Sequence, residues 1–242
     1  MKTKIFILTL ILTILSGRMF SQTLALQAGS GPASQNICGS SSITDIIYTF
    51  SGCNGTVTVK DQAGHALTTN GYTVTFDPAA NAASGTVTIS GAPSSSPLAV
   101  TYTVKVPIAG TDLTESGSLN AYTALTPGTI TSDQTICYHT APVELAGVAP
   151  VGGDGSNSYQ WQTDASGSWA NIPSATLLNY QPPVLDVTTS YRLNQTSAIC
   201  GTVTTNTVTI TVKDEFVVGS ISSSQTICYH TAPAELIGVA PT

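Results

Sequence analysis

A 24-residue segment occurs twice in this chain of 242 residues, and it sets the length of the folding unit. Residues 128–151 and 219–242 match at 18 of 24 positions, at a constant offset of 91 residues. A weaker third start lies at Gln35-Asn36-Ile37-Cys38, which is similar to residues 134–137. A repeat of about this length is typical of a β-sandwich domain.

Apolar and polar residues alternate along most of the remaining sequence. The clearest alternating segments are 56–59, 72–76, 86–89, 100–106 and 208–212. Alternation with β-branched and aromatic residues predicts strands with one buried face, and Gly-, Pro- and Ser-rich breaks separate them. We therefore predict an all-β fold of tandem antiparallel β-sandwiches.

The repeat predicts the domain organisation. Residues 24–125 form a first sandwich and residues 127–213 a second one, joined by a short linker at Thr126-Pro127-Gly128. Residues 217–242 are the start of another copy, truncated after its opening strands, and we expect this part to be poorly ordered or loosely docked. A proline in so short a linker limits its swing and predicts a semi-rigid string of modules.

The first 21 residues have the pattern of a secretory signal peptide. Lys2 and Lys4 precede an apolar run at 5–15, and small and polar residues lead to a cleavage site near Ser21. A retained membrane anchor is disfavoured because the run is short and no stop-transfer pattern follows. We predict a secreted protein, extracellular or on the cell surface, with no membrane insertion after the leader is removed.

Charge excludes one large class of partners. Of seven basic residues, Lys2, Lys4 and Arg18 leave with the leader, so four remain against thirteen acidic residues, a formal charge of −9. Four scattered basic side chains give no electrostatic footprint for nucleic acid.

The second sandwich carries an immunoglobulin-like layout. Trp161, within Tyr159-Gln160-Trp161-Gln162, is predicted to point into the core between the sheets. Tyr191 is predicted in the core as well, at the corner where a tyrosine hydroxyl bonds back to the backbone. Leu193 stands where an antibody domain has its second cysteine, so the antibody disulfide does not transfer.

These residues resemble a known group of bacterial surface modules. The segments that carry the resemblance are 134–142, 159–162, 190–192 and 200–206, and Ile89-Ser90-Gly91-Ala92-Pro93 carries a weaker one in the first module. They resemble the Ig-like and PKD-like repeats of Bacteroidetes cell-surface proteins, including gliding-motility adhesins of the SprB type. The resemblance implies many tandem copies, surface display and a type IX sorting domain.

Five cysteines fit an exported, oxidised chain. We expect disulfides between Cys137 and Cys200 and between Cys38 and Cys53, although spacing alone does not fix the connectivity. Cys228 is then unpaired, because its partner would lie 91 residues after Cys200. No Cys-x-x-Cys or Cys/His spacing indicates a metal site.

Catalytic motifs are absent from the sequence. His139 and His230 are one repeat position occurring twice and are expected in a turn, while His65 lies in a loop without an evident partner. Asp154 and Asp164 could offer carboxylates to Ca²⁺, but no spaced acidic motif supports this. We therefore predict no catalytic residue, no cofactor and no metal.

The favoured function is a non-enzymatic surface repeat, acting as a structural stalk and adhesion module. Its expected partners are surface glycans or proteins and the neighbouring Ig-like modules of the same chain. The alternative is an accessory spacer or carbohydrate-binding region of a secreted multidomain enzyme. A sugar platform would draw on the aromatic residues Tyr138, Tyr159, Trp161, Trp169, Tyr180 and Tyr191.

Overall fold

The computed structural model describes residues 21–221 and 224–241, and its regular elements are strands except for one short 3-10 turn, η1 (Leu67–Asn70). The all-β prediction is confirmed. The predicted signal peptide, 1–21, lies outside the described residues apart from Ser21. No helix in the described part has the length and apolar character needed to cross a membrane.

The described chain forms two compact units. The N-terminal unit holds residues up to 126 together with the short segments 151–157 and 196–202, and the C-terminal unit holds the rest. The two short segments belong to the second sequence repeat and contain two of its turns. The N-terminal unit is therefore built from three separate stretches of the chain.

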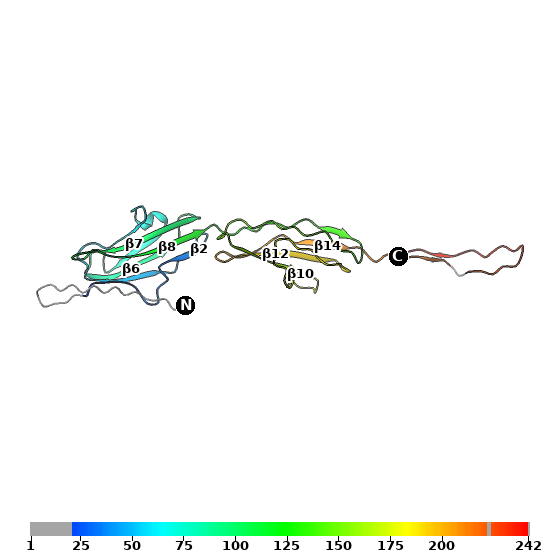
Figure 1. The fold of residues 1–242 in the computed structure, drawn as a ribbon, viewed down its shortest axis with the longest axis horizontal. Coiled ribbons are helices and arrows are strands. Elements are labelled where there is room, and N and C mark those ends of the chain that lie inside the picture. The colour runs from blue at the N-terminus through cyan, green and yellow to red at the C-terminus, as the bar shows by residue number, and fades with distance from the viewer. Residues whose placement is uncertain (1–20, 222–223, 242) are drawn as a thin grey trace. The chain divides into compact units, whose positions relative to one another are not determined.

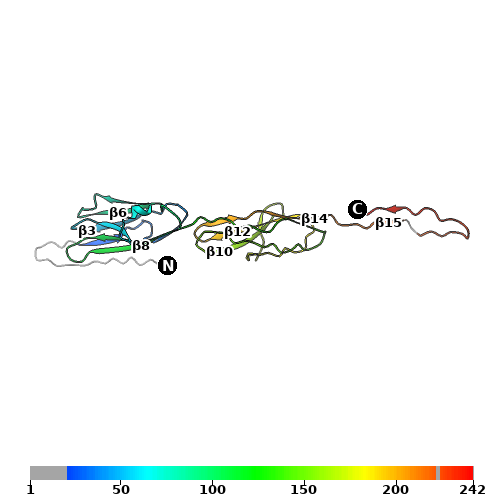
Figure 2. The same ribbon diagram turned by 90° about the horizontal axis from the view of Figure 1, so that it is seen from above.

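The N-terminal unit consists of two four-stranded sheets (Figures 1 and 2). One sheet has the order β1-β3-β6-β5 and the other the order β2-β8-β7-β4. Their bounds are β1 Thr23–Leu26, β3 Ile46–Ser51, β6 Ser84–Gly91, β5 Tyr72–Asp77, β2 Gln35–Cys38, β8 Leu113–Tyr122, β7 Leu98–Val106 and β4 Thr58–Asp61. Strand β2 pairs with β8 in parallel, whereas the other pairs in these two sheets are antiparallel.

Alternation along the strands produces the core between these sheets. In β7, the side chains of Val100, Tyr102, Val104 and Val106 are buried, while Lys105 between them is exposed. Period two places every second side chain on the face that meets the opposite sheet.

Two tyrosines join the sheets of the N-terminal unit by hydrogen bonds. The hydroxyl of Tyr102 donates to the carbonyl of Ala33 at 2.9 Å and lies 3.1 Å from the hydroxyl of Tyr48, which therefore acts as the donor between them. Burial raises the pKa of Tyr102 well above its usual value, so the phenol stays neutral. Gly117 makes room for this arrangement, since a Cβ there would lie 2.0 Å from the Ala33 carbonyl oxygen.

The main sheet of the C-terminal unit has the order β11-β10-β12-β14-β9, with β13 paired to β12. The strands are β9 Gln134–Ile136, β10 Asn157–Thr163, β11 Ala170–Asn171, β12 Thr189–Ser197, β13 Gly201–Thr204 and β14 Val208–Val212. The facing layer is irregular and is held by isolated bridges between Ile130 and Gly147, Thr140 and Leu185, and Leu145 and Tyr180.

Trp161 is the centre of the C-terminal core. Its side chain has no exposed surface, and its indole N–H donates to the carbonyl of Leu177 at 3.0 Å. Tyr180 lies between Trp161 and Tyr191, with ring centroids 5.6 Å and 5.9 Å away. Burial raises the pKa of Tyr191 to about 12. The predicted corner bond is not present in the described residues, where no backbone group pairs with the Tyr191 hydroxyl.

Side-chain amides replace ladder bonds in the irregular layer. The buried Gln195 accepts from the Gly128 N–H at 2.8 Å and donates to the Val148 carbonyl at 2.7 Å. Asn206 likewise accepts from the Ile130 N–H at 2.9 Å and donates to the Ile130 carbonyl at 3.3 Å. Backbone groups that lack a strand neighbour are thereby satisfied.

A glutamine near the start of each repeat makes a similar pair of bonds to the residue nine positions later. The amide oxygen accepts from that residue's N–H, and the amide nitrogen donates to its carbonyl. The pairs are Gln35 with Thr44 (2.9 and 2.7 Å), Gln134 with Val143 (2.9 and 3.0 Å) and Gln225 with Ala234 (2.7 and 3.0 Å). We call this the glutamine bracket.

The last part of the chain forms a hairpin without a core. Strands β15 (Ser220–Ile221) and β16 (Gly238–Val239) pair antiparallel, and the described side chains from residue 213 onward are exposed.

Two tyrosine-to-phenylalanine variants test the polar link between the sheets. Y102F leaves the buried Tyr48 hydroxyl and the Ala33 carbonyl without their partner, so we expect a loss of about 1–3 kcal/mol in unfolding free energy. Y72F is the matched control, because the Tyr72 hydroxyl is buried with no hydrogen-bond partner among the described residues, and we expect it to be neutral or stabilising. Denaturant unfolding followed by tyrosine absorbance measures both, and an equal loss in the two variants would contradict the assignment.

Candidate functional site

The cysteine pairing differs from the sequence expectation. The structure joins Cys38 to Cys200, with an S–S distance of 2.05 Å and Cα atoms 5.0 Å apart. Cys137, the predicted partner of Cys200, is an exposed free thiol. The prediction was wrong because it paired cysteines within one sequence repeat, whereas residues 196–202 belong to the N-terminal unit together with Cys38.

The second expected disulfide, Cys38 with Cys53, is also wrong. Cys53 is buried and free, and its thiol donates to the carbonyl of Gly55 at 3.2 Å. Cys53 follows β3, and β3 belongs to the sheet that faces the sheet of β2. The Cys53 side chain packs into the core as a small apolar residue. Cys228 is free and exposed.

Two elements position the disulfide. Cys38 ends β2 and lies opposite Tyr122 in the parallel register with β8, while Cys200 ends the tight turn after β12. The Cys200 N–H donates to the hydroxyl of Ser197 at 3.3 Å. The Cys200 sulfur lies 3.5 Å from the Thr123 carbonyl oxygen, a contact only, because a disulfide sulfur has no hydrogen to donate.

Glycines bring segment 151–157 against the same stretch of backbone. The Gly153 N–H donates to the Thr123 carbonyl at 2.8 Å, and Thr126 and Val151 exchange backbone bonds at 2.8 and 3.0 Å. Gly152 has a φ of 92°, and a Cβ there would lie 2.3 Å from the Ala124 carbonyl oxygen. Only glycine allows both the left-handed conformation and this close approach.

An aspartate secures the turn that carries Cys200. The Ser197 hydroxyl donates to Asp154 Oδ1 at 2.6 Å, and the Ser156 N–H donates to the same oxygen at 3.3 Å. The hydrogen bond from Ser197 holds the pKa of Asp154 below its usual value. No sequence pattern predicts this pair, because the two residues are 43 positions apart.

The histidines do not assemble a catalytic centre in the described residues. His139 Nδ1 lies 2.8 Å from Asp186 Oδ1, and both side chains are largely exposed. Sequence spacing did not reveal this acid, and no nucleophile of the described chain contacts the imidazole. His139 and His230 both have left-handed backbone, with φ of 57° and 62°, which places the repeated position in a turn.

Neither aspartate considered for Ca²⁺ belongs to a cluster of ligands. Asp154 bonds to Ser197 in the N-terminal unit, and Asp164 accepts from the Ser190 N–H at 2.7 Å in the C-terminal unit. The described residues contain no group of three or more His, Cys, Asp or Glu side chains suited to a metal ion.

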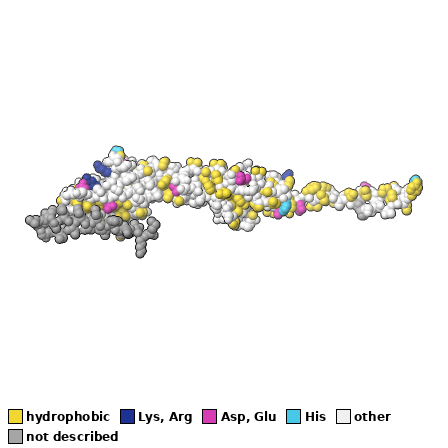
Figure 3. Space-filling view, viewed as in Figure 1, with side chains coloured by type: hydrophobic (Ala, Val, Ile, Leu, Met, Phe, Trp, Pro, Cys, Tyr) yellow, Lys and Arg dark blue, Asp and Glu magenta, His cyan; other side chains and the backbone are white. Residues whose placement is uncertain are grey.

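Four of the six aromatic residues considered for a sugar platform, Tyr159, Trp161, Tyr180 and Tyr191, belong to the core of the C-terminal unit or pack against it. The Arg192 guanidinium lies over the Trp169 ring at 4.2 Å. Charged side chains are sparse on the face shown in Figure 3.

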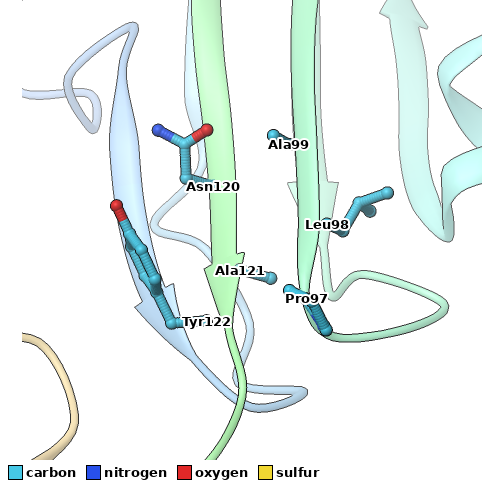
Figure 4. A pocket seen from close by; sticks show the side chains of 6 residues that line it. All are labelled: Pro97, Leu98, Ala99, Asn120, Ala121 and Tyr122. Carbon is cyan, nitrogen blue, oxygen red and sulfur yellow. The ribbon is translucent and has the colours of Figure 1, made fainter. Parts of the chain in front are cut away.

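The N-terminal unit has small surface grooves of mixed lining. One of about 240 Å³ lies between β7 and β8 and is lined by Pro97, Leu98, Ala99, Asn120, Ala121 and Tyr122 (Figure 4). Its lining offers one amide and one phenol but no acid–base pair. The disulfide and the turn that holds it are therefore the best-defined candidate site in the described chain.

Comparison with known proteins identifies the fold. Residues 126–214 match a family described as a domain of unknown function (DUF8696). Solved structures similar to the chain include titin domains A168-A170 (14% identity, TM-score 0.55, 79% of this chain and 66% of that one). The I-band fragment I67-I69 of titin is similar too (14%, TM-score 0.57, 81% and 67%), as are extracellular domains 3-5 of Drosophila OTK (14%, TM-score 0.51, 79% and 62%). No curated protein matches.

These likenesses define the class: the chain is a tandem of immunoglobulin-like β-sandwiches. It spans about two thirds of the length of the three-domain structures that it matches. At 14% identity the likeness shows the fold alone.

Disulfide mapping tests the site directly. Non-reducing peptide mapping of the mature chain should link Cys38 to Cys200 and recover Cys53, Cys137 and Cys228 as thiols.

The stability of cysteine variants tests the same bond. The bond closes a loop with a sequence separation of 162, so C200S should lose up to about 5 kcal/mol of unfolding free energy in the chain-entropy model. C137S removes only an exposed thiol and should keep the parent stability. Equal stability of the two variants would contradict the pairing.

The pH dependence of stability tests the Asp154 contact. Because the folded pKa of Asp154 is lowered, ionisation stabilises the fold above the usual carboxyl pKa, and this contribution is lost as the pH falls through the folded value. D154N carries a neutral isostere and should melt below the parent at about pH 6, with the difference closing near about pH 2. A difference that stays constant over this range would show that charge plays no part.

Proposed function

We propose that the chain is a non-enzymatic module pair of an exported, cell-surface protein, where it acts as a load-bearing stalk and adhesion region. The observation that carries the proposal is the Cys38–Cys200 disulfide. It supports an oxidising compartment, in which such bonds persist. It also determines which part of the chain would carry tension.

A pulling force follows the covalent path between the two attachment points. Force applied between residue 22 and the C-terminus runs along the chain to Cys38, crosses the S–S bond to Cys200 and continues toward Val212. The 162-residue separation between the cysteines is bypassed, and most of both sandwiches lies inside it. Most residues of the two cores, Tyr102 and Trp161 among them, then lie inside the bypassed loop, whereas Leu24 of one core and Val208 and Ile210 of the other remain on the loaded path.

The charge and surface of the chain agree with a structural role. A long exported protein with a formal charge of −9 and polar, uncharged strand faces stays soluble without attracting nucleic acid. Contacts with surface proteins or glycans would then come from exposed loops of the sandwiches rather than from a cleft.

Single-molecule pulling tests the stalk proposal. With handles at residue 22 and Thr242, the oxidised mature chain should not release the segment between Cys38 and Cys200. The reduced chain and C200S should release it, which adds up to about 580 Å of contour length at 3.6 Å per residue. C137S is the matched control and should behave as the oxidised parent. Release of the full length by the oxidised parent would overturn the load-bearing role of the disulfide.

A further inference from the structure

Three cysteines hold the same place in their repeats. Cys38, Cys137 and Cys228 each follow a Gln-x-Ile sequence, and in each case the glutamine forms the bracket described above. We call these the head cysteines and Cys200 the turn cysteine. The bracket shows that the three starts share local structure as well as sequence.

The first two head cysteines also lie at the same place in their sheets. Strand β2 pairs in parallel with the end of β8, with Gln35 opposite Leu119. Strand β9 pairs in parallel with the end of β14, with Gln134 opposite Ile210. Cys38 is the last residue of β2 and Cys137 is the residue directly after β9, so both lie where the last strand of the module leads out of the sheet.

The distance along the chain to the next repeat is conserved as well. Gly128, the first residue of one copy, follows Leu119 by nine residues, and Gly219, the first residue of the next copy, follows Ile210 by nine. Cys38 therefore has the same position relative to the copy that begins at Gly128 as Cys137 has relative to the copy that begins at Gly219.

The observed disulfide joins a head cysteine to the turn of the following module. Cys38 lies in the first module, and Cys200 lies in the second sequence repeat, 72 residues after Gly128. The corresponding turn of the first module, residues 107–112 between β7 and β8, has no cysteine. A bond between the head cysteine and the turn of its own module would leave Cys38 without a partner, whereas a bond to the turn of the next module accounts for both observations.

We propose that Cys137 is the half-site of a second disulfide of this kind, and that its partner is the turn cysteine of a following copy of the repeat. The exposed thiol of Cys137 is the free form of that half-site. The inference rests on the proposed function, because it makes each module of a stalk covalently bound to the next. Cys228 would occupy the same position for a further copy.

The bond forms by oxidation of two thiols. The two cysteines lose two protons and two electrons as their sulfurs join, and a low-molecular-weight disulfide such as glutathione disulfide accepts these and becomes two thiols. Thiol–disulfide exchange of this kind requires an accessible thiolate, which the exposed position of Cys137 allows.

An extended chain tests the proposal. Thr242 is equivalent to Val151 at the 91-residue offset, so a copy of residues 152–213 added after Thr242 completes the next repeat. After oxidation with glutathione disulfide, peptide mapping should show Cys137 bonded to the added copy of Cys200, with Cys38 and Cys200 still paired and Cys228 a thiol. C137S in the extended chain should leave the added cysteine free, whereas C228S should change nothing.

Two outcomes overturn the proposal: a bond between the added cysteine and Cys228, or a free added cysteine in a chain whose added module resists proteolysis. The Cys38–Cys200 bond in the same map and the pulling experiment above test the stalk function, whereas the bond of the added cysteine tests only this proposal. The two can therefore fail separately.

A second measurement needs no added module. In the oxidised 242-residue chain, the thiols of Cys137 and Cys228 should react with an alkylating reagent under native conditions, and that of Cys53 only after unfolding. Cys137 found already bonded to Cys53 or Cys228, or protected like Cys53, would also overturn the proposal.

Discussion

Parallel pairing of the short strand β2 with the last strand of its own sandwich is the interaction on which the candidate site depends. It brings the start of the module to the edge of β8 and places Cys38 beside Tyr122, where the chain leaves the sheet. If β2 paired with β8 in the antiparallel direction, Cys38 would lie at a different position along β8. Strands β9 and β14 repeat the arrangement, so the position of Cys137 follows from the same backbone geometry.

Polar side chains form hydrogen bonds to backbone groups that are paired between strands in more regular sandwiches. The irregular layer of the C-terminal unit is satisfied by Gln195 and Asn206, and the glutamine bracket holds the start of each repeat. Buried backbone groups need partners, and side-chain amides supply both a donor and an acceptor. This explains how a sequence with few ion pairs and short strands keeps a defined fold.

Much of the strand pattern could be predicted, because alternation is a local property. Segment 208–212 coincides with β14, and segments 72–76, 86–89 and 100–106 lie inside β5, β6 and β7. Segment 56–59 was placed two residues early, since Val57 bonds to Ala80 outside the ladder. The alternation does not predict strand β8, because Glu115 and Gly117 stand at core-facing positions where apolar residues are expected, although β7 pairs with it along the whole of β7.

The sequence by itself determined the repeat length, the all-β class and the burial of Trp161, because these follow from periodicity and composition within short stretches. Only the tertiary structure decided the disulfide and its supporting contacts. Cys38 and Cys200 are separated by 162 residues, and Asp154 and Ser197 by 43, so no local pattern links them. Their pairing depends on which loops the folded chain brings into one compact unit, and that is decided by packing over the whole chain.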